Sequence, residues 1–118
     1  PKVPAVFLIW VIQNLVFVSI PEEAFFRGFF QQELDQAFGL KPMGTSCSII
    51  ITSILFALLH IGWSPNFSAI ALTFCTSLFY GVIYRWTQAI EASIFCHFGF
   101  NTVHFLFFSY PFAIQPGF

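Results

Sequence analysis

The chain has 118 residues, of which 58% are hydrophobic and 8% charged, and its formal net charge is −1. Soluble domains carry about 25% charged residues, so this deficit argues against water as the main solvent of the chain. The nearly neutral charge provides no basic stripe, which argues against a nucleic-acid partner. The lipid bilayer is therefore the expected partner. The predicted fold is an all-α, polytopic bundle of transmembrane helices in a multi-pass integral membrane protein, in the cell membrane if the source is bacterial.

The first predicted element covers residues 3–38. Residues 3–20 form an apolar run of about 27 Å as a helix, close to the ~30 Å thickness of a bilayer core. Pro21 follows, where a helix is expected to kink or restart. Residues 22–38 contain both polar and apolar side chains, and they end at Gly39, a helix stop. We predict a bent helical unit whose first part spans the membrane and whose second part buries a polar face or emerges at the surface.

Three more apolar segments follow a predicted turn at residues 41–44. The predicted spans are residues 46–61, 67–84 and 88–108, with an interfacial tail at residues 109–118. They bring the expected number of spans to about four. No repeat or linker divides the chain, so we expect a single domain over residues 1–118. Because Pro1 is not an initiator residue, we expect this domain to be the C-terminal core of a larger bundle.

The three cysteines, Cys47, Cys75 and Cys96, all lie within apolar runs. Their odd number argues against a closed disulfide framework. We therefore expect buried structural thiols.

Several polar side chains lie inside these apolar segments, where a charge costs about 2.5–3.5 kcal/mol on insertion scales. Glu23 and Arg27 are spaced i,i+4 with the acid first, the favoured order for an ion pair on one helix face. Glu22 is rotated by about 100° from that face and remains available for other work. His97 and Asn101 are also one turn apart, so they predict a polar line on the last helix.

Taken singly, these residues have simpler explanations. The i,i+4 pair alone suits a structural ion pair, and His60, one turn after Phe56, suits an interfacial or interhelical hydrogen bond. His104 continues the polar line of the last helix and is expected to be structural. The joint occurrence of the motifs is what favours a functional site.

Three motifs occur in order on separate apolar helices. They are EExxxR at Glu22–Arg27, FxxxH at Phe56–His60 and HxxxN at His97–Asn101. In this order the motifs, within about residues 19–108, resemble the CPBP family of intramembrane proteases. That family includes CAAX prenyl endopeptidases and bacteriocin-processing or immunity-associated members. The resemblance implies an endopeptidase that cuts near the membrane-embedded or lipid-modified C-terminus of a membrane-anchored peptide or protein substrate.

Peptide hydrolysis needs an activated water, stabilisation of the oxyanion and a proton for the leaving amine. An apolar pocket favours the neutral form of a carboxyl group, which suits Glu22 as a general base that becomes a general acid. His60 is expected to help hold the water, and His97 and Asn101 to donate to the oxyanion. The candidate catalytic residues, including a supporting ion pair, are Glu22, Glu23, Arg27, His60, His97 and Asn101.

A divalent metal such as zinc is the alternative cofactor. Glu22, His60 and His97 make a possible zinc set with an open position. The chain has no HExxH motif, which favours a metal-free glutamate mechanism. Asp35 is the only aspartate, which excludes a two-aspartate protease within this chain.

Two functions of other classes remain open at this point. A non-catalytic membrane protein, such as an immunity factor or a scaffold, could keep the same polar cluster for stability or partner binding. Half of a transporter with Glu22 as an ion site is disfavoured, because no inverted repeat is visible. The catalytic hypothesis requires Glu22 and His60 to lie within about 10 Å of each other, with room for a water.

Overall fold

The computed structural model describes residues 6–39, 41–62 and 66–109. Every regular element in these ranges is helical, which confirms the predicted all-α fold. One long helix consists of α1 (Phe7–Gln13), η1 (Asn14–Ser19), α2 (Ile20–Phe25), η2 (Phe26–Gln31) and α3 (Gln32–Phe38). It is followed by α4 (Pro42–Leu59), α5 (Phe67–Thr87), α6 (Ile90–His104) and η3 (Phe105–Ser109). The η segments are π-helical turns that continue their neighbouring α-helices.

Among the described residues, three helices are long and apolar enough to cross a membrane, by length and composition. They are Phe7–Phe38, Pro42–Leu59 and Phe67–Thr87. The fourth predicted span corresponds to α6 and η3 and is not among them, because polar residues interrupt its apolar sequence. The structure therefore fits the predicted helical membrane bundle, with three qualifying spans where about four were expected.

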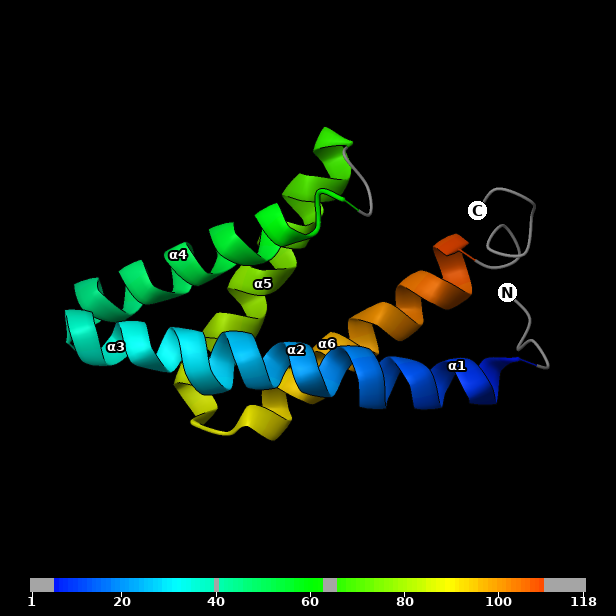
Figure 1. The fold of residues 1–118 in the computed structure, drawn as a ribbon, viewed down its shortest axis with the longest axis horizontal. Coiled ribbons are helices and arrows are strands. Elements are labelled where there is room, and N and C mark those ends of the chain that lie inside the picture. The colour runs from blue at the N-terminus through cyan, green and yellow to red at the C-terminus, as the bar shows by residue number, and fades with distance from the viewer. Residues whose placement is uncertain (1–5, 40, 63–65, 110–118) are drawn as a thin grey trace.

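The long helix passes Pro21 without restarting (Figure 1). A proline lacks an N–H, and its ring clashes with the carbonyl four residues earlier in a regular helix. The π turn before Pro21 widens the helix there, and Ile20 donates its N–H to the carbonyl of Leu15, five residues back. The local widening relieves the clash, so the expected restart is replaced by one continuous helix of 32 residues.

The connection between α3 and α4 is tighter than predicted. Gly39 ends α3 with a φ of 90°, as expected of a glycine stop. The predicted turn at residues 41–44 is wrong, because Pro42 already begins α4. Proline suits that first turn, since its missing N–H would have no helical partner. A Cβ at Gly44 would overlap the carbonyl oxygen of Gly39, so glycine allows α4 to start directly against the end of α3.

All three later helices pack on the middle of the long helix. α4 runs back along α3 and η2, α5 crosses η2, and α6 crosses η1 and α2 (Figure 1). α5 also packs between α4 and α6. The centre of the long helix is consequently the most enclosed part of the bundle.

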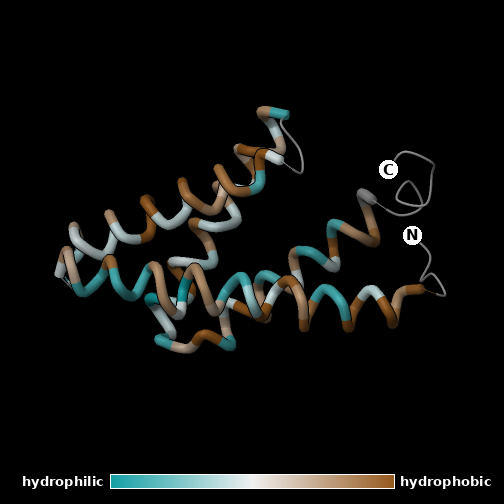
Figure 2. Tube along the Cα trace, in the orientation of Figure 1, coloured by the Kyte–Doolittle hydropathy of each residue, from teal (hydrophilic) through white to brown (hydrophobic). Residues whose placement is uncertain are grey.

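A buried line of polar side chains follows the long helix, and we name it the polar stripe. Its members are Ser19, Glu23, Arg27, Gln31 and Asp35. A regular α-helix would rotate this four-residue repeat by about 40° at each step. The π turns η1 and η2 on either side of α2 lower the rotation per residue, which keeps the stripe facing the other helices. Figure 2 shows hydrophilic positions recurring along the long helix, whereas α4 is mostly white and brown.

The outer surface is apolar, as a lipid-facing surface requires. Large side chains such as Phe17, Phe67 and Trp86 are mostly exposed. Cys47 and Cys75 are exposed and Cys96 is half-buried, and all are free thiols. The expectation of buried thiols is wrong, because small polar residues and the polar stripe occupy the interior.

Candidate active site

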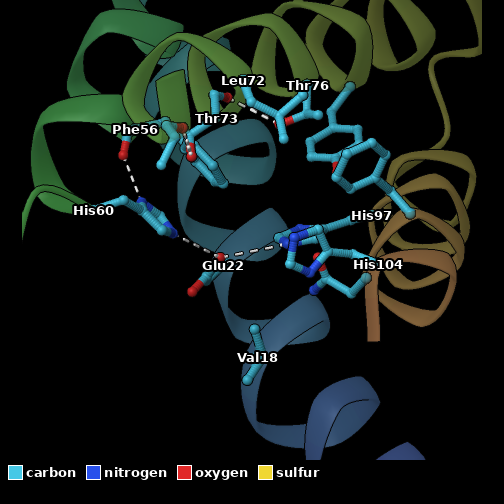
Figure 3. A pocket seen from close by; sticks show the side chains of 13 residues that line it. Val18, Glu22, Phe56, His60, Leu72, Thr73, Thr76, His97 and His104 are labelled. Atoms are coloured by element: carbon cyan, nitrogen blue, oxygen red, sulfur yellow. Dashed lines mark hydrogen bonds and ion pairs between the residues drawn. The ribbon is translucent and has the colours of Figure 1, made fainter. Parts of the chain in front are cut away.

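A cavity of about 480 Å³ opens beside α2 and is enclosed by the end of α4, by α5 and by α6. Four of the six predicted site residues line it: Glu22, His60, His97 and Asn101. The other two, Glu23 and Arg27, are fully buried in the wall behind it. The structure thus places residues from three motifs, spread over 80 positions of sequence, around one hollow (Figure 3).

Glu22 lies between two imidazole rings in this cavity (Figure 3). Its Oε1 atom is 3.7 Å from Nε2 of His60 and 3.6 Å from Nε2 of His97. These distances are longer than direct hydrogen bonds, and Oε1 has no hydrogen-bond partner among the described residues. The side chain is 30% exposed, so solvent reaches it. The three groups therefore converge on a point where a small polar molecule can bind.

His60 is oriented by its own helix. Its Nδ1 atom lies 2.6 Å from the carbonyl oxygen of Phe56. A carbonyl only accepts, so Nδ1 carries the hydrogen and Nε2 is the nitrogen that faces Glu22. The ring stacks on Phe56 with centroids 4.4 Å apart, which explains the one-turn FxxxH spacing. The nearby Glu22 carboxylate raises the pKa of His60, and partial burial opposes this rise.

His97 is oriented from the opposite side by Glu23. The Nδ1 atom of His97 is 2.8 Å from Oε2 of Glu23, and both side chains are buried. The imidazole stacks on Tyr80, with centroids 4.8 Å apart and planes 15° from parallel. Glu23 thereby fixes the ring so that Nε2 faces Glu22. The sequence predicted only Arg27 as a partner of Glu23.

Arg27 neutralises Glu23 and ties the long helix to α5. Its Nε atom is 3.4 Å from Oε1 of Glu23, so the predicted ion pair is present. Its Nη2 donates to the hydroxyl of Ser77 at 2.7 Å and to the carbonyl oxygen of the same residue. The guanidinium also lies 5.4 Å and 5.5 Å from the ring centroids of Phe56 and Tyr80. A buried charge is tolerated here because it has both an anion and aromatic faces around it.

Asn101 reaches the cavity from α6 and contacts the start of the long helix. Its Nδ2 donates to Oδ1 of Asn14 at 3.3 Å, and Ser19 donates to the same oxygen. An amide nitrogen carries two hydrogens, so one bond to Asn14 leaves a second donor for a ligand. His104, which was expected to be structural, also lines the cavity.

The sequence interpretation missed three supporting residues: Asn14, Ser77 and Tyr80. Asn14 carried a usable signal, because it is a polar residue five positions before Ser19 in an apolar run. Ser77 and Tyr80 carried none, since serine and tyrosine are common in membrane helices and only packing shows their role.

The donor set around the cavity has the composition of a zinc site. One carboxylate and two imidazole nitrogens face a common point, and these donor types suit zinc. However, within residues 6–39, 41–62 and 66–109, no group of three or more His, Cys, Asp or Glu side chains is arranged to hold a metal ion. The separations of 3.6 and 3.7 Å between Oε1 of Glu22 and the two Nε2 atoms are close to those between ligands of one zinc ion, so chelation is the test that separates the two mechanisms.

Comparison with known proteins identifies the family. A family model described as type II CAAX prenyl endopeptidase Rce1-like matches residues 4–103. No curated protein and no solved structure gives a significant match. The matched range contains all three motifs and most of the chain. The chain therefore belongs to the Rce1-like family of type II CAAX prenyl endopeptidases, a family of integral membrane proteases.

Proposed function

We propose that this chain is a glutamate-type intramembrane endopeptidase. It hydrolyses a peptide bond near the membrane-embedded or lipid-modified C-terminus of a substrate. The observation that supports this function is the position of Glu22, which faces Nε2 of both His60 and His97 on the wall of a 480 Å³ cavity. This arrangement meets the geometric requirement for a carboxylate and an imidazole that share one water.

The carboxylate of Glu22 is the general base. A water held between Glu22 and Nε2 of His60 gives a proton to the carboxylate as its oxygen attacks the peptide carbonyl carbon. The new C–O bond forms while the carbonyl π electrons move to oxygen. Glu22 then returns the proton to the amide nitrogen as the C–N bond breaks, which releases an amine and an acid. Glu22 thus acts first as the general base and then as the general acid.

His97 and Asn101 serve the oxyanion. Their side chains come from one face of α6 and both line the cavity. An N–H donor aimed at the developing oxyanion is commonly worth about 3–4 kcal/mol. Because Nδ1 of His97 donates to Glu23, Nε2 donates to the oxyanion only when the ring carries a second proton, and the Glu23 carboxylate stabilises that positive charge. The buried ion pair of Glu23 and Arg27 acts by positioning, because neither side chain lines the cavity.

Cleavage by a Glu22→Gln variant tests the proposal. Wild type and variant, reconstituted in lipid vesicles, are given lipid-modified or tail-anchored peptides, and the products are identified by mass spectrometry. We expect Glu22→Gln to lower turnover by about 10²- to 10⁴-fold, because it removes the base and keeps the shape. Glu91→Gln is the matched control, since Glu91 is an exposed glutamate in the first turn of α6. Full turnover by Glu22→Gln would support a non-catalytic role of the cluster.

Chelation separates the glutamate mechanism from its metal alternative. In the alternative, Glu22, His60 and His97 would hold a zinc ion that polarises the peptide carbonyl and its attacking water. We expect EDTA to leave the turnover of wild type unchanged. Loss of turnover in EDTA with recovery on added zinc would replace the metal-free mechanism.

A further inference from the structure

A second hollow lies between the beginning of α4 and the end of α5, and we name it the α4–α5 groove. Its volume is about 470 Å³. It is lined by Pro42, Thr45, Ile49, Val82, Arg85 and Trp86. It shares no lining residue with the catalytic cavity, so it is separate from the proposed chemistry.

The inner end of the groove is closed by the contact between its two helices. A Cβ at Gly81 would lie 2.9 Å from Cγ2 of Ile49, so α4 and α5 touch there. Pro42 begins α4 about two turns, or 10 Å, before Ile49. On the other wall, Val82 and Arg85 follow Gly81 toward the end of α5. The groove thus extends from this contact to the outer ends of both helices.

The outer end of the groove lies at the depth of the lipid headgroups. α5 has 21 residues and a length of about 32 Å, close to the ~30 Å thickness of a bilayer core. Arg85 and Trp86 belong to its last turn, and Pro42 is the first residue of α4. Arginine and tryptophan suit this depth, because each has an apolar part and a polar end. The groove therefore begins among headgroups and ends among acyl chains.

Arg85 places a cation at the outer end of the groove. Among the residues that the structure describes, its guanidinium makes no ion pair or hydrogen bond, and no acidic side chain lines the groove. Val82 and Trp86 are more than half exposed, so apolar surface adjoins this cation. A ligand that complements both features has an anionic head and an apolar chain.

We propose that the α4–α5 groove binds an anionic phospholipid of the surrounding bilayer. The phosphate accepts hydrogen bonds from the guanidinium of Arg85, whose planar fork suits a phosphate group. One acyl chain lies between Val82 and Ile49 and ends at the contact with Gly81. Basic pockets between transmembrane helices bind anionic headgroups in this way. The lipid fills the space between the two helices and stabilises their crossing, whether or not the chain is a protease.

Native mass spectrometry of the protein in detergent tests the site. The protein is titrated with phosphatidylglycerol or phosphatidylcholine of equal chain length, and the lipid adducts give each Kd. We expect wild type to bind phosphatidylglycerol about tenfold more tightly than phosphatidylcholine, and Arg85→Gln to lose this preference. Equal binding of the two lipids by wild type would overturn the proposal.

Lys41→Gln is the matched control for charge. Lys41 is an exposed cation beside Pro42 at the same end of the bundle, but it does not line the groove. We expect this variant to keep the preference for phosphatidylglycerol. An equal loss in Lys41→Gln and Arg85→Gln would show general attraction to a positive surface and overturn the site.

A blocked groove tests the position of the acyl chain. Val82→Trp places an indole in the groove and keeps Arg85, whereas Ile50→Trp adds the same ring at an exposed position of α4 outside the groove. We expect Val82→Trp to weaken phosphatidylglycerol binding about tenfold and Ile50→Trp to leave it unchanged. Unchanged binding by Val82→Trp would place the lipid elsewhere. A dimer without lipid adducts would show that a second copy covers the groove, and either result overturns the proposal.

Thermal unfolding in detergent gives a second measurement of the same site. Without phospholipid, we expect Arg85→Gln to unfold at the Tm of wild type. Added phosphatidylglycerol should raise the Tm of wild type and not that of Arg85→Gln, because a ligand of the folded state stabilises it. Equal shifts of the two proteins would contradict binding at Arg85. These measurements do not use turnover, so an inactive Glu22→Gln variant and a failed lipid site give different results.

Discussion

Glu23 and His97 lie 74 residues apart in sequence, and the carboxylate oxygen Oε2 of Glu23 is 2.8 Å from Nδ1 of His97. The second oxygen of the same carboxylate is 3.4 Å from Nε of Arg27. Glu23 therefore joins a buried cation to a ring that faces the cavity. This contact links the long helix with α6 and determines which nitrogen of His97 is presented to Glu22.

Glu23→Gln should affect catalysis more than binding. The variant keeps the shape of the side chain but removes the charge that supports His97. Partners that orient functional histidines commonly contribute about 10- to 100-fold to activity, and we expect kcat to fall by this amount with KM nearly unchanged. Steady-state kinetics in vesicles measure both constants. A higher KM with normal kcat would show that Glu23 acts in substrate binding instead.

Arg27→Met should destabilise the fold strongly. The change leaves the Glu23 carboxylate buried without its cation, and breaking a buried pair commonly costs about 3–5 kcal/mol. Chemical unfolding in detergent measures the free energy. Arg85→Met, at the end of α5, is the control, with an expected change within about 0.5 kcal/mol.

The double variant Glu23→Gln, Arg27→Met completes this test. We expect it to be more stable than Arg27→Met alone, because it no longer contains an unpaired buried charge. Equal stability of the two variants would mean that the ion pair does not hold this part of the bundle.

Local spacing predicted the parts of the site that depend on one helix. The i,i+4 separation of Glu23 and Arg27 predicted their ion pair, and the one-turn step from Phe56 to His60 predicted a shared face. The contact of Glu23 with His97 depends on how two distant helices cross, and spacing along one chain contains no such information. Of the two partners of Glu23, the sequence therefore predicted Arg27 but not His97.

The polar stripe shows a second limit of the sequence interpretation. Its four-residue repeat does not match the 3.6-residue period of a regular helix. On a regular helix its five residues would therefore be assigned to different faces. Only the π turns beside α2 align Ser19 with Asp35. The sequence also contained no sign of the widened π turn before Pro21. Pro21 was therefore expected to kink or restart the helix.

Titration of His60 should depend on Glu22. The Glu22 carboxylate, 3.7 Å from Nε2, raises the pKa of His60 above its ordinary value of 6.5. We expect NMR titration to give a midpoint above 6.5 in wild type and a lower midpoint in Glu22→Gln, which removes the main cause. A midpoint that does not move would contradict the contact between the two side chains.

The raised pKa of His60 determines how both stability and turnover change with pH. A raised pKa in the folded state contributes stability that is fully present below the unfolded pKa and is lost as pH rises through the folded value. Turnover should change in the opposite direction, because His60 holds the water through an unprotonated Nε2. We expect turnover to fall as pH decreases through the raised pKa of His60, in a pH–rate profile measured at saturating substrate.

Gly81 should be required where α5 meets the long helix. A Cβ at this position would lie 2.9 Å from Cγ2 of Ile49 and 3.0 Å from Oε1 of Gln31, so Gly81→Ala requires these side chains to shift. Overpacking of this kind commonly costs about 1–3 kcal/mol. Gly99→Ala is the matched control, because a Cβ there meets no atom within 4 Å and alanine improves helix propensity by about 1 kcal/mol. We expect Tm to fall for Gly81→Ala and to hold or rise for Gly99→Ala. Turnover of Gly81→Ala should fall as well, because side chains of α5 hold Arg27 and His97 in place. Equal Tm for the two variants would exclude close packing as the role of Gly81.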